Sequence, residues 1–130
     1  MSFKHLLLID DDEDDREIFL SVIEVVSPAT MCAIAANGRE GLNVLASAST
    51  LPQLIFLDLN MPLMDGRQFL IEVKKNSSWK DIPVVILSTS SDRDSITRTK
   101  ELGAADFITK PDKYSGWEST LKKFLTERRI

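Results

Sequence analysis

The chain has little of what several classes of protein require. Cys32 is the only cysteine in 130 residues, so no disulfide can form within the chain and no zinc site can be built from thiolates. No apolar run approaches the ~20 residues that span a bilayer, and residues 1–9 lack the features of a signal peptide. The net charge of −4 opposes direct contact with nucleic acid. These absences favour a soluble cytoplasmic domain that binds neither membrane nor nucleic acid directly.

The size and composition of the chain fit one globular domain. Its length lies within the range of about 100–150 residues that is common for domains. Hydrophobic residues make up 43% of the chain and charged residues 28%, which is ordinary for a globular protein. No repeat, low-complexity segment or linker divides the sequence. We therefore expect a single domain over residues 1–130, with no separate output domain.

Short apolar runs alternate with amphipathic stretches along the chain. Uninterrupted apolar runs predict strands buried on both faces, and apolar residues three or four apart predict helices. The predicted strands cover residues 3–9, 29–37, 54–58, 83–88 and 106–110. The predicted helices cover residues 14–26, 38–49, 64–76, 92–103 and 115–125. We expect Gly103 to cap the fourth helix, and Ser115 with Glu118 has the spacing of a capping box.

The strict alternation of strands and helices predicts an α/β fold. Five such units imply a parallel sheet with helices on both faces. Among doubly wound folds, the flavodoxin-like strand order 2-1-3-4-5 suits a chain this short. Ligands of such sheets bind outside the carboxyl ends of the strands, near the point where the strand order reverses. We therefore expect functional residues at that edge.

Four of the predicted strands end in polar side chains. Asp10 and Asp11 follow the first strand, Asp58 ends the third, Ser88 the fourth and Lys110 the fifth. The first and third strands are neighbours in the predicted order, so the three carboxylates would lie together. Two carboxylates 4 Å apart repel by roughly 1 kcal/mol in water and about 4 kcal/mol at an effective dielectric of 20. A divalent cation with oxygen ligands offsets this repulsion, which predicts a Mg²⁺ site beside a phosphoryl group.

The same residue types suit phosphoryl transfer. An aspartate carboxylate can attack phosphorus and form an acyl phosphate. Mg²⁺ and Lys110 can then balance the charge on the equatorial oxygens, and the Ser88 hydroxyl can donate a hydrogen bond to one of them.

Four segments resemble the signatures of the response-regulator receiver domain family. They are "LLLIDDDEDD", "LIFLDLNMPLMDG", "PVVILSTS" and "GAADFITKP", in the order and spacing of the family over nearly the whole chain. The compact size and the start "IDDDEDDREIF" also resemble stand-alone, chemotaxis-regulator-like receivers that work with sensor kinases, including bacterial phytochromes. The resemblance implies a domain that a phosphoryl group switches on.

The resemblance also assigns the phosphorylation site. Asp58 would be the phosphoacceptor. Asp11, Asp58 and the backbone carbonyl of Asn60 would bind Mg²⁺, and Asp10 would act on the cation indirectly.

Phosphoryl binding and switching are assigned to a second group of residues: Ser88, Thr89, Lys110 and Phe107. Phe107 stands where the family has its switch aromatic, often a tyrosine. The family also implies a cis peptide bond between Lys110 and Pro111.

The implied partners are proteins. A sensor histidine kinase or a histidine phosphotransfer protein would supply the phosphoryl group. Output would be a changed affinity for an unidentified protein or transfer of the group onward. The chain would be no enzyme beyond its own phosphorylation and dephosphorylation. A homodimer through residues 92–103, 106–110 and 115–125 is left open.

Two alternatives compete with this interpretation. A phosphatase of the haloacid dehalogenase type would use Asp10 as nucleophile and Asp12 as general acid, but Asp14 stands where that motif has threonine or valine. The second alternative is a receiver fold that serves only as a scaffold. The remaining acids from Asp12 to Asp15 are interpreted as a helix start without chemistry, because acidic residues near a helix N-terminus are favoured by about 0.3–1 kcal/mol each.

Overall fold

Strands and helices alternate along the computed structural model, which describes residues 3–61, 64–90 and 92–127. The strands are β1 His5–Ile9, β2 Met31–Ala35, β3 Leu54–Asp58, β4 Val84–Ser88 and β5 Asp106–Thr109. The helices are α1 Glu13–Val26, α2 Gly38–Ser47, α3 Gly66–Lys75, α4 Arg93–Glu101 and α5 Tyr114–Glu127. Each lies within a few residues of its predicted range.

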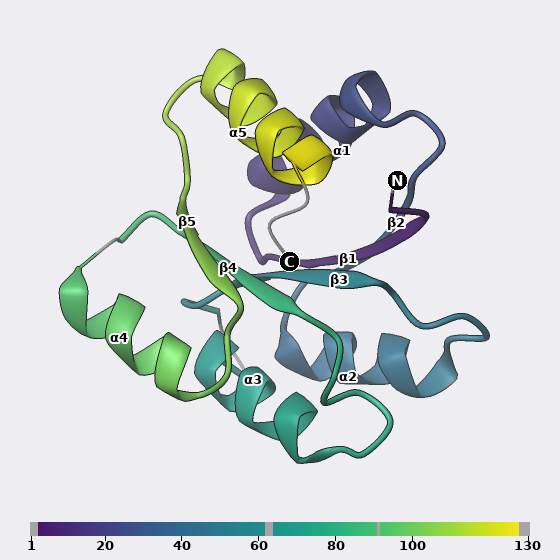
Figure 1. The fold of residues 1–130 in the computed structure, drawn as a ribbon, viewed down its shortest axis with the longest axis vertical. Coiled ribbons are helices and arrows are strands. Elements are labelled where there is room, and N and C mark those ends of the chain that lie inside the picture. Colours follow the sequence, from purple (N-terminus) through teal and green to yellow (C-terminus); the bar gives the residue numbers. More distant parts are fainter. Residues whose placement is uncertain (1–2, 62–63, 91, 128–130) are drawn as a thin grey trace.

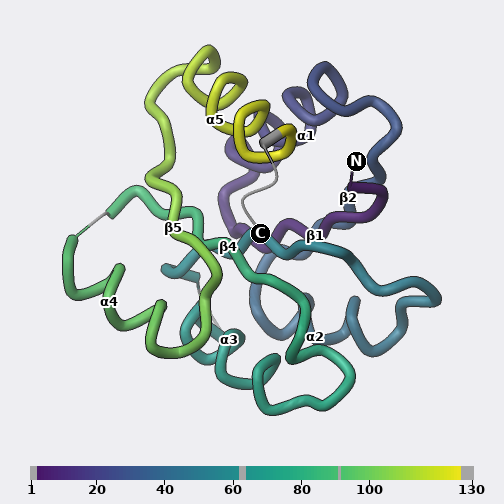
Figure 2. Tube along the Cα trace, in the orientation of Figure 1, coloured from purple at the N-terminus to yellow at the C-terminus, as the bar shows by residue number. Residues whose placement is uncertain are grey.

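The strands form one parallel sheet in the order β2-β1-β3-β4-β5, which confirms the predicted topology. Helices α1 and α5 lie side by side on one face of the sheet, and α2, α3 and α4 lie on the other (Figure 1). The trace in Figure 2 shows the chain leaving β5 and crossing to the face that carries α1 and α5. The order reverses between β1 and β3, so the carboxyl ends of these two strands are neighbours.

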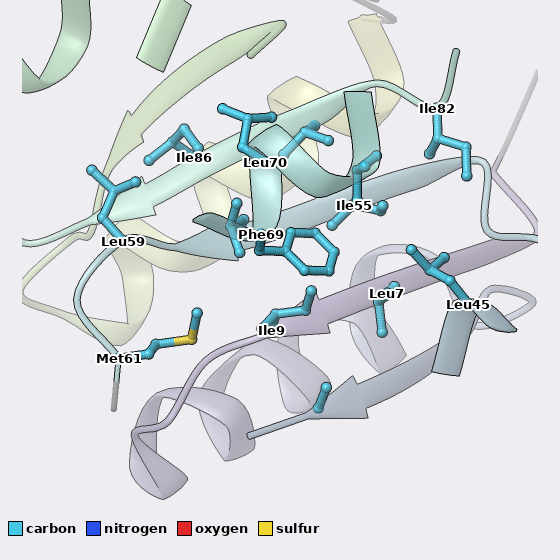
Figure 3. Close-up of a cluster of buried hydrophobic side chains, with 14 residues drawn as sticks. Leu7, Ile9, Leu45, Ile55, Leu59, Met61, Phe69, Leu70, Ile82 and Ile86 are labelled. Atoms are coloured by element: carbon cyan, nitrogen blue, oxygen red, sulfur yellow. The ribbon is translucent and has the colours of Figure 1, made fainter. Parts of the chain in front are cut away.

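Two buried clusters hold the layers together. One lies between the sheet and α2 with α3, where Phe69 of α3 extends toward Ile9 of β1 (Figure 3). The other lies under α1 and α5 and includes the ring of Phe56, whose centroid is 5.0 Å from that of Phe19 in an edge-on arrangement. Every residue of β3 and β4 is buried, because helices cover both of their faces.

Polar residues define where several helices begin or end. Asp12 is the N-cap of α1, and its side chain accepts a hydrogen bond from the backbone N–H of Asp15 at 3.0 Å. Asp65 and Gln68 form a capping box at α3. The side chain of Asp65 accepts a hydrogen bond from the Gln68 N–H, and the side chain of Gln68 accepts one from the Asp65 N–H. Gly103, with φ of +107°, follows α4 as predicted.

The capping box predicted at Ser115 is wrong. Helix α5 already begins at Tyr114, and the carbonyl of Lys113 accepts hydrogen bonds from the N–H groups of Gly116 and Trp117. Ser115 therefore lies inside the first turn rather than before it.

Gly66 holds the loop after Asp58 against the start of α3. A Cβ atom at this position would lie 2.8 Å from the Cα of Leu59 and would also clash with the carbonyl oxygen of Asp58. Both obstacles are backbone, so neither can rotate away.

We therefore expect Gly66→Ala to lower the free energy of unfolding by about 1–3 kcal/mol, because the backbone must shift to relieve the overlap. Urea unfolding measures this change, with Glu72→Ala on the exposed side of α3 as the control. A Gly66→Ala variant as stable as that control would contradict the expected overlap.

Candidate functional site

Three carboxylates meet at the carboxyl ends of β1 and β3. Asp10, Asp11 and Asp58 each offer an oxygen, and these atoms lie within 4.8 Å of one another. Asp10 is 1% exposed and Asp58 is 7% exposed, whereas Asp11 is open to solvent. The predicted grouping is therefore present, with one member accessible from outside.

Lys110 supplies the positive charge of this group. Its Nζ lies 2.8 Å from Asp10 Oδ2, 2.8 Å from Asp15 Oδ2 and 3.6 Å from Asp58 Oδ2. Burial disfavours the ammonium form, but the contacts with Asp10 and Asp15 and the attraction of Asp58 outweigh it, so the pKa of Lys110 is raised. Lys110 therefore stays charged.

The contact with Asp15 corrects the interpretation of that residue as a simple helix start. Asp15 lies in the first turn of α1, and its carboxylate accepts a hydrogen bond from Lys110. The sequence places Asp15 five residues after Asp10, near the same edge of the sheet. No local pattern indicates that its side chain turns toward a lysine 95 residues away.

Asp10 is held rigidly on three sides. Its backbone N–H donates to the carbonyl of Ala35 at 3.0 Å, its carbonyl accepts from the Arg16 guanidinium at 2.9 Å, and its Oδ1 accepts from the Asp12 N–H at 2.9 Å. Its buried Oδ2 lies 2.8 Å from Lys110 Nζ in an ion pair. Carboxylate oxygens of Asp10, Asp11 and Asp58 this close to one another suit a hard divalent cation.

The surroundings of Asp58 change how readily its carboxyl group ionises. Burial, together with the charges of Asp10 and Asp11, raises the pKa of Asp58 to about 7, although Lys110 and the Asn60 backbone N–H act in the opposite direction. A cation bound to these carboxylates would favour the ionised, nucleophilic form of Asp58.

The predicted phosphoryl-binding hydroxyl is buried at the end of β4. The Ser88 Oγ accepts a hydrogen bond from the Ser90 N–H at 3.2 Å, and the Ser90 hydroxyl donates to Asp92 Oδ2 at 2.8 Å. Asp92 is the N-cap of α4. These bonds join Ser88 to the start of α4, while Thr89 beside it is exposed.

The aromatic residue predicted to switch lies on β5. Phe107 is half-buried and packs against the cluster that includes Phe69. It also lines a cavity of about 250 Å³ with residues of α4, among them Ile96 and Thr99. The ring therefore has space on the side of α4.

The predicted cis peptide bond between Lys110 and Pro111 is wrong. The described residues contain no cis peptide bond. The trans form is favoured by about 0.5–1 kcal/mol in X–Pro bonds. The trans chain still brings Lys110 Nζ to the carboxylates, so the contacts of the site do not require the cis form.

Comparison with known proteins identifies the family. A family model described as "Response regulator receiver domain" matches residues 6–118, so the chain belongs to this family of two-component signalling domains. The probable C4-dicarboxylate response regulator DctR of Bacillus subtilis is 34% identical over 119 residues, which are 92% of this chain and 51% of DctR. Response regulator Rcp1 of Synechocystis sp. is 36% identical over 115 residues, which are 82% of this chain and 76% of Rcp1.

Solved structures agree with this assignment. The phosphorylated cyanobacterial phytochrome response regulator RcpA has a TM-score of 0.87 and 30% identity, with 95% of this chain and 94% of that chain covered. The Mn²⁺-bound form of Rcp1 has a TM-score of 0.84 and 30% identity, with 93% of this chain and 91% of that chain covered.

The chain spans about half the length of DctR. Within the described residues, we find no helix long and apolar enough to cross a membrane.

The raised pKa of Asp58 predicts how stability depends on pH. The folded protein binds a proton at Asp58 up to about pH 7, whereas the unfolded chain loses it near 3.8. Stability therefore falls as pH rises through this window. Asp58→Asn removes this effect, and we expect it to exceed the wild type in free energy of unfolding by about 1–3 kcal/mol at pH 8.

Urea unfolding at pH 5 and pH 8 tests the prediction, with the exposed Asp14→Asn as a control for loss of one negative charge. The advantage of Asp58→Asn should shrink at pH 5, and Mg²⁺ should reduce it at pH 8 by stabilising the wild type. Equal free energies of unfolding for the variant and the wild type at pH 8 without Mg²⁺ would contradict the raised pKa of Asp58.

Proposed function

We propose that this chain is a phosphorylation-dependent switch in which Asp58 is the phosphoacceptor. The observation that carries the proposal is the convergence of Lys110 and two further carboxylates on Asp58 at the carboxyl edge of the sheet. The proposed phosphodonor is a phosphohistidine of a sensor histidine kinase or of a histidine phosphotransfer protein.

In the proposed reaction, an Asp58 Oδ atom attacks phosphorus and forms a P–O bond. The P–N bond of the phosphohistidine breaks, and the imidazole nitrogen keeps the electron pair and is free to take up a proton. No general base is needed, because a bound cation would hold the attacking carboxylate in its ionised form. Lys110 offsets the negative charge that reaches the site with the phosphoryl group.

Mg²⁺ is the proposed cofactor, held by Asp11, Asp58 and the backbone carbonyl of Asn60, with Asp10 acting indirectly. The oxygen-only donor set supports a hard cation. The Mn²⁺-bound form of Rcp1 is a related protein with a divalent cation. When bound, the cation would supply charge stabilisation for the transferred oxygens.

The proposed switch begins at Ser88. Its hydroxyl now accepts from the Ser90 N–H and would turn to the new phosphoryl oxygens. Thr89 and the rest of the loop would follow, and Phe107 would turn into the space beside α4. The surface of α4, β5 and α5 would then change its affinity for a protein partner. Dimerisation through this surface stays a prediction, as does a cytoplasmic location.

The haloacid dehalogenase alternative has less support. In that mechanism Asp12 would be the general acid, but its carboxylate accepts the N–H of Asp15 as the N-cap of α1. Asp10, the nucleophile of that mechanism, is 1% exposed, less than Asp58 at 7%. We also propose that residues 1–130 act as one receiver domain, whose output is a changed affinity for a protein or transfer of the phosphoryl group onward.

We predict that the wild type gains one phosphate when it is incubated with Mg²⁺ and a small acyl phosphate. Asp58→Asn should abolish the gain, because it removes the attacking carboxylate. Intact mass spectrometry measures both results.

Asp10→Asn distinguishes the alternatives. It should slow labelling of Asp58 by weakening the cation site, whereas a phosphatase mechanism requires that Asp10→Asn abolish labelling and that Asp58→Asn retain it. Failure of the wild type to gain phosphate would favour the scaffold.

A further inference from the structure

The Asp15 carboxylate gives Lys110 a partner outside the group of three acids. Asp15 Oδ2 accepts a hydrogen bond from Lys110 Nζ at 2.8 Å, the same distance that separates Nζ from Asp10 Oδ2. Asp58 Oδ2 lies farther away, at 3.6 Å. The ammonium group is therefore held toward Asp10 and Asp15, beyond hydrogen-bonding distance of Asp58.

The start of α1 directs the Asp15 side chain to this contact. Asp15 is the third residue of α1, and its backbone N–H is fixed by Asp12. In a capping box the third side chain turns back to the N–H of the cap residue. Here that N–H, of Asp12, donates to Asp10 Oδ1 instead, and the Asp15 carboxylate reaches Lys110.

The ion pair between Asp15 and Lys110 is largely shielded from solvent. The side chain of Lys110 is 6% exposed and that of Asp15 is 23% exposed. An ion pair at this depth is screened less by water and salt than one on the surface. Asp14, the preceding residue in the same turn, is exposed, so its charge acts mainly through solvent.

We propose that Asp15 is a positioning residue that keeps Lys110 at a distance from Asp58. This inference rests on the proposed phosphorylation of Asp58. Lys110 released from Asp15 would be free to close on Asp58 and form a tight ion pair. Such a pair would occupy an Asp58 carboxylate oxygen, and attack on phosphorus and cation binding both need the oxygens of this carboxylate. At its present distance the ammonium leaves that oxygen open and remains near the space where phosphoryl oxygens would project.

Two measurements on the full chain test the role of Asp15. Isothermal titration calorimetry with Mg²⁺ gives the cation affinity of the unphosphorylated protein. Intact mass over time with a small acyl phosphate at saturating Mg²⁺ gives the rate of phosphorylation. The variants are Asp15→Ala, Asp15→Asn and the control Asp14→Ala, each checked by urea unfolding.

We expect Asp15→Ala to weaken Mg²⁺ binding and to slow phosphorylation, each by about tenfold, the scale on which partners of site residues act. Asp15→Asn retains an oxygen that can accept from Lys110 and should give an intermediate effect, and it replaces Asp15→Ala if that variant does not fold. Asp14→Ala, which removes the same charge from an exposed position, should stay within twofold of the wild type.

Equal values for Asp15→Ala and Asp14→Ala would overturn the proposal, because charge alone would then explain the effect. Faster phosphorylation of Asp15→Ala would also overturn it, since Asp15 would then restrain Lys110 from a useful contact. A wild type that binds Mg²⁺ without gaining phosphate would refute the proposed function alone, and the Mg²⁺ affinities would still test whether Asp15 holds Lys110 away from Asp58.

Discussion

The contact of one buried ammonium group with several carboxylates is the constraint on which the site depends. Lys110 lies within 4 Å of Asp10, Asp15 and Asp58, and Asp11 adds a further negative charge nearby. One positive charge cannot balance four negative ones at this range. Burial, with the charges of Asp10 and Asp11, raises the pKa of Asp58, and the excess of negative charge suits a bound cation.

The fold makes this crowding tolerable by fixing the backbone around it. The carboxylates extend from the ends of β1 and β3, which are buried on both faces and cannot move apart without disrupting two core clusters. Gly66 lets α3 approach the loop after Asp58 at a distance that no side chain would permit. The stability of the hydrophobic layers therefore maintains an arrangement that electrostatics alone would disperse.

The opposite end of the site is built from weaker interactions. Ser88 is linked to α4 through Ser90 and Asp92 by single hydrogen bonds at the exposed start of the helix. Helix α4 buries only Thr99, and a cavity separates it in part from Phe107. The carboxylates at the ends of β1 and β3 are held firmly, whereas Ser88 and α4 are held by few bonds. This difference suits a switch, because a new charge can move Ser88 and α4 without displacing the carboxylates.

Much of this protein was determined by sequence alone. Uninterrupted apolar runs predicted the buried strands β1, β3 and β4, and the strand order was predicted from the strict alternation of strands with helices and from the chain length. The polar residues that end four of the strands then predicted the meeting of Asp10, Asp58 and Lys110, since parallel strands present their carboxyl ends at one edge.

Only the tertiary structure decided the contact of Asp15 with Lys110 and the first residue of α5. Local patterning assigned Asp15 to the helix dipole, and nothing nearby in sequence competes with that interpretation. Its partner is a lysine brought in by β5 after four crossovers. The direction of a side chain at a helix start depends on which charge lies across from it, and that charge is set by packing of distant segments rather than by neighbours along the chain.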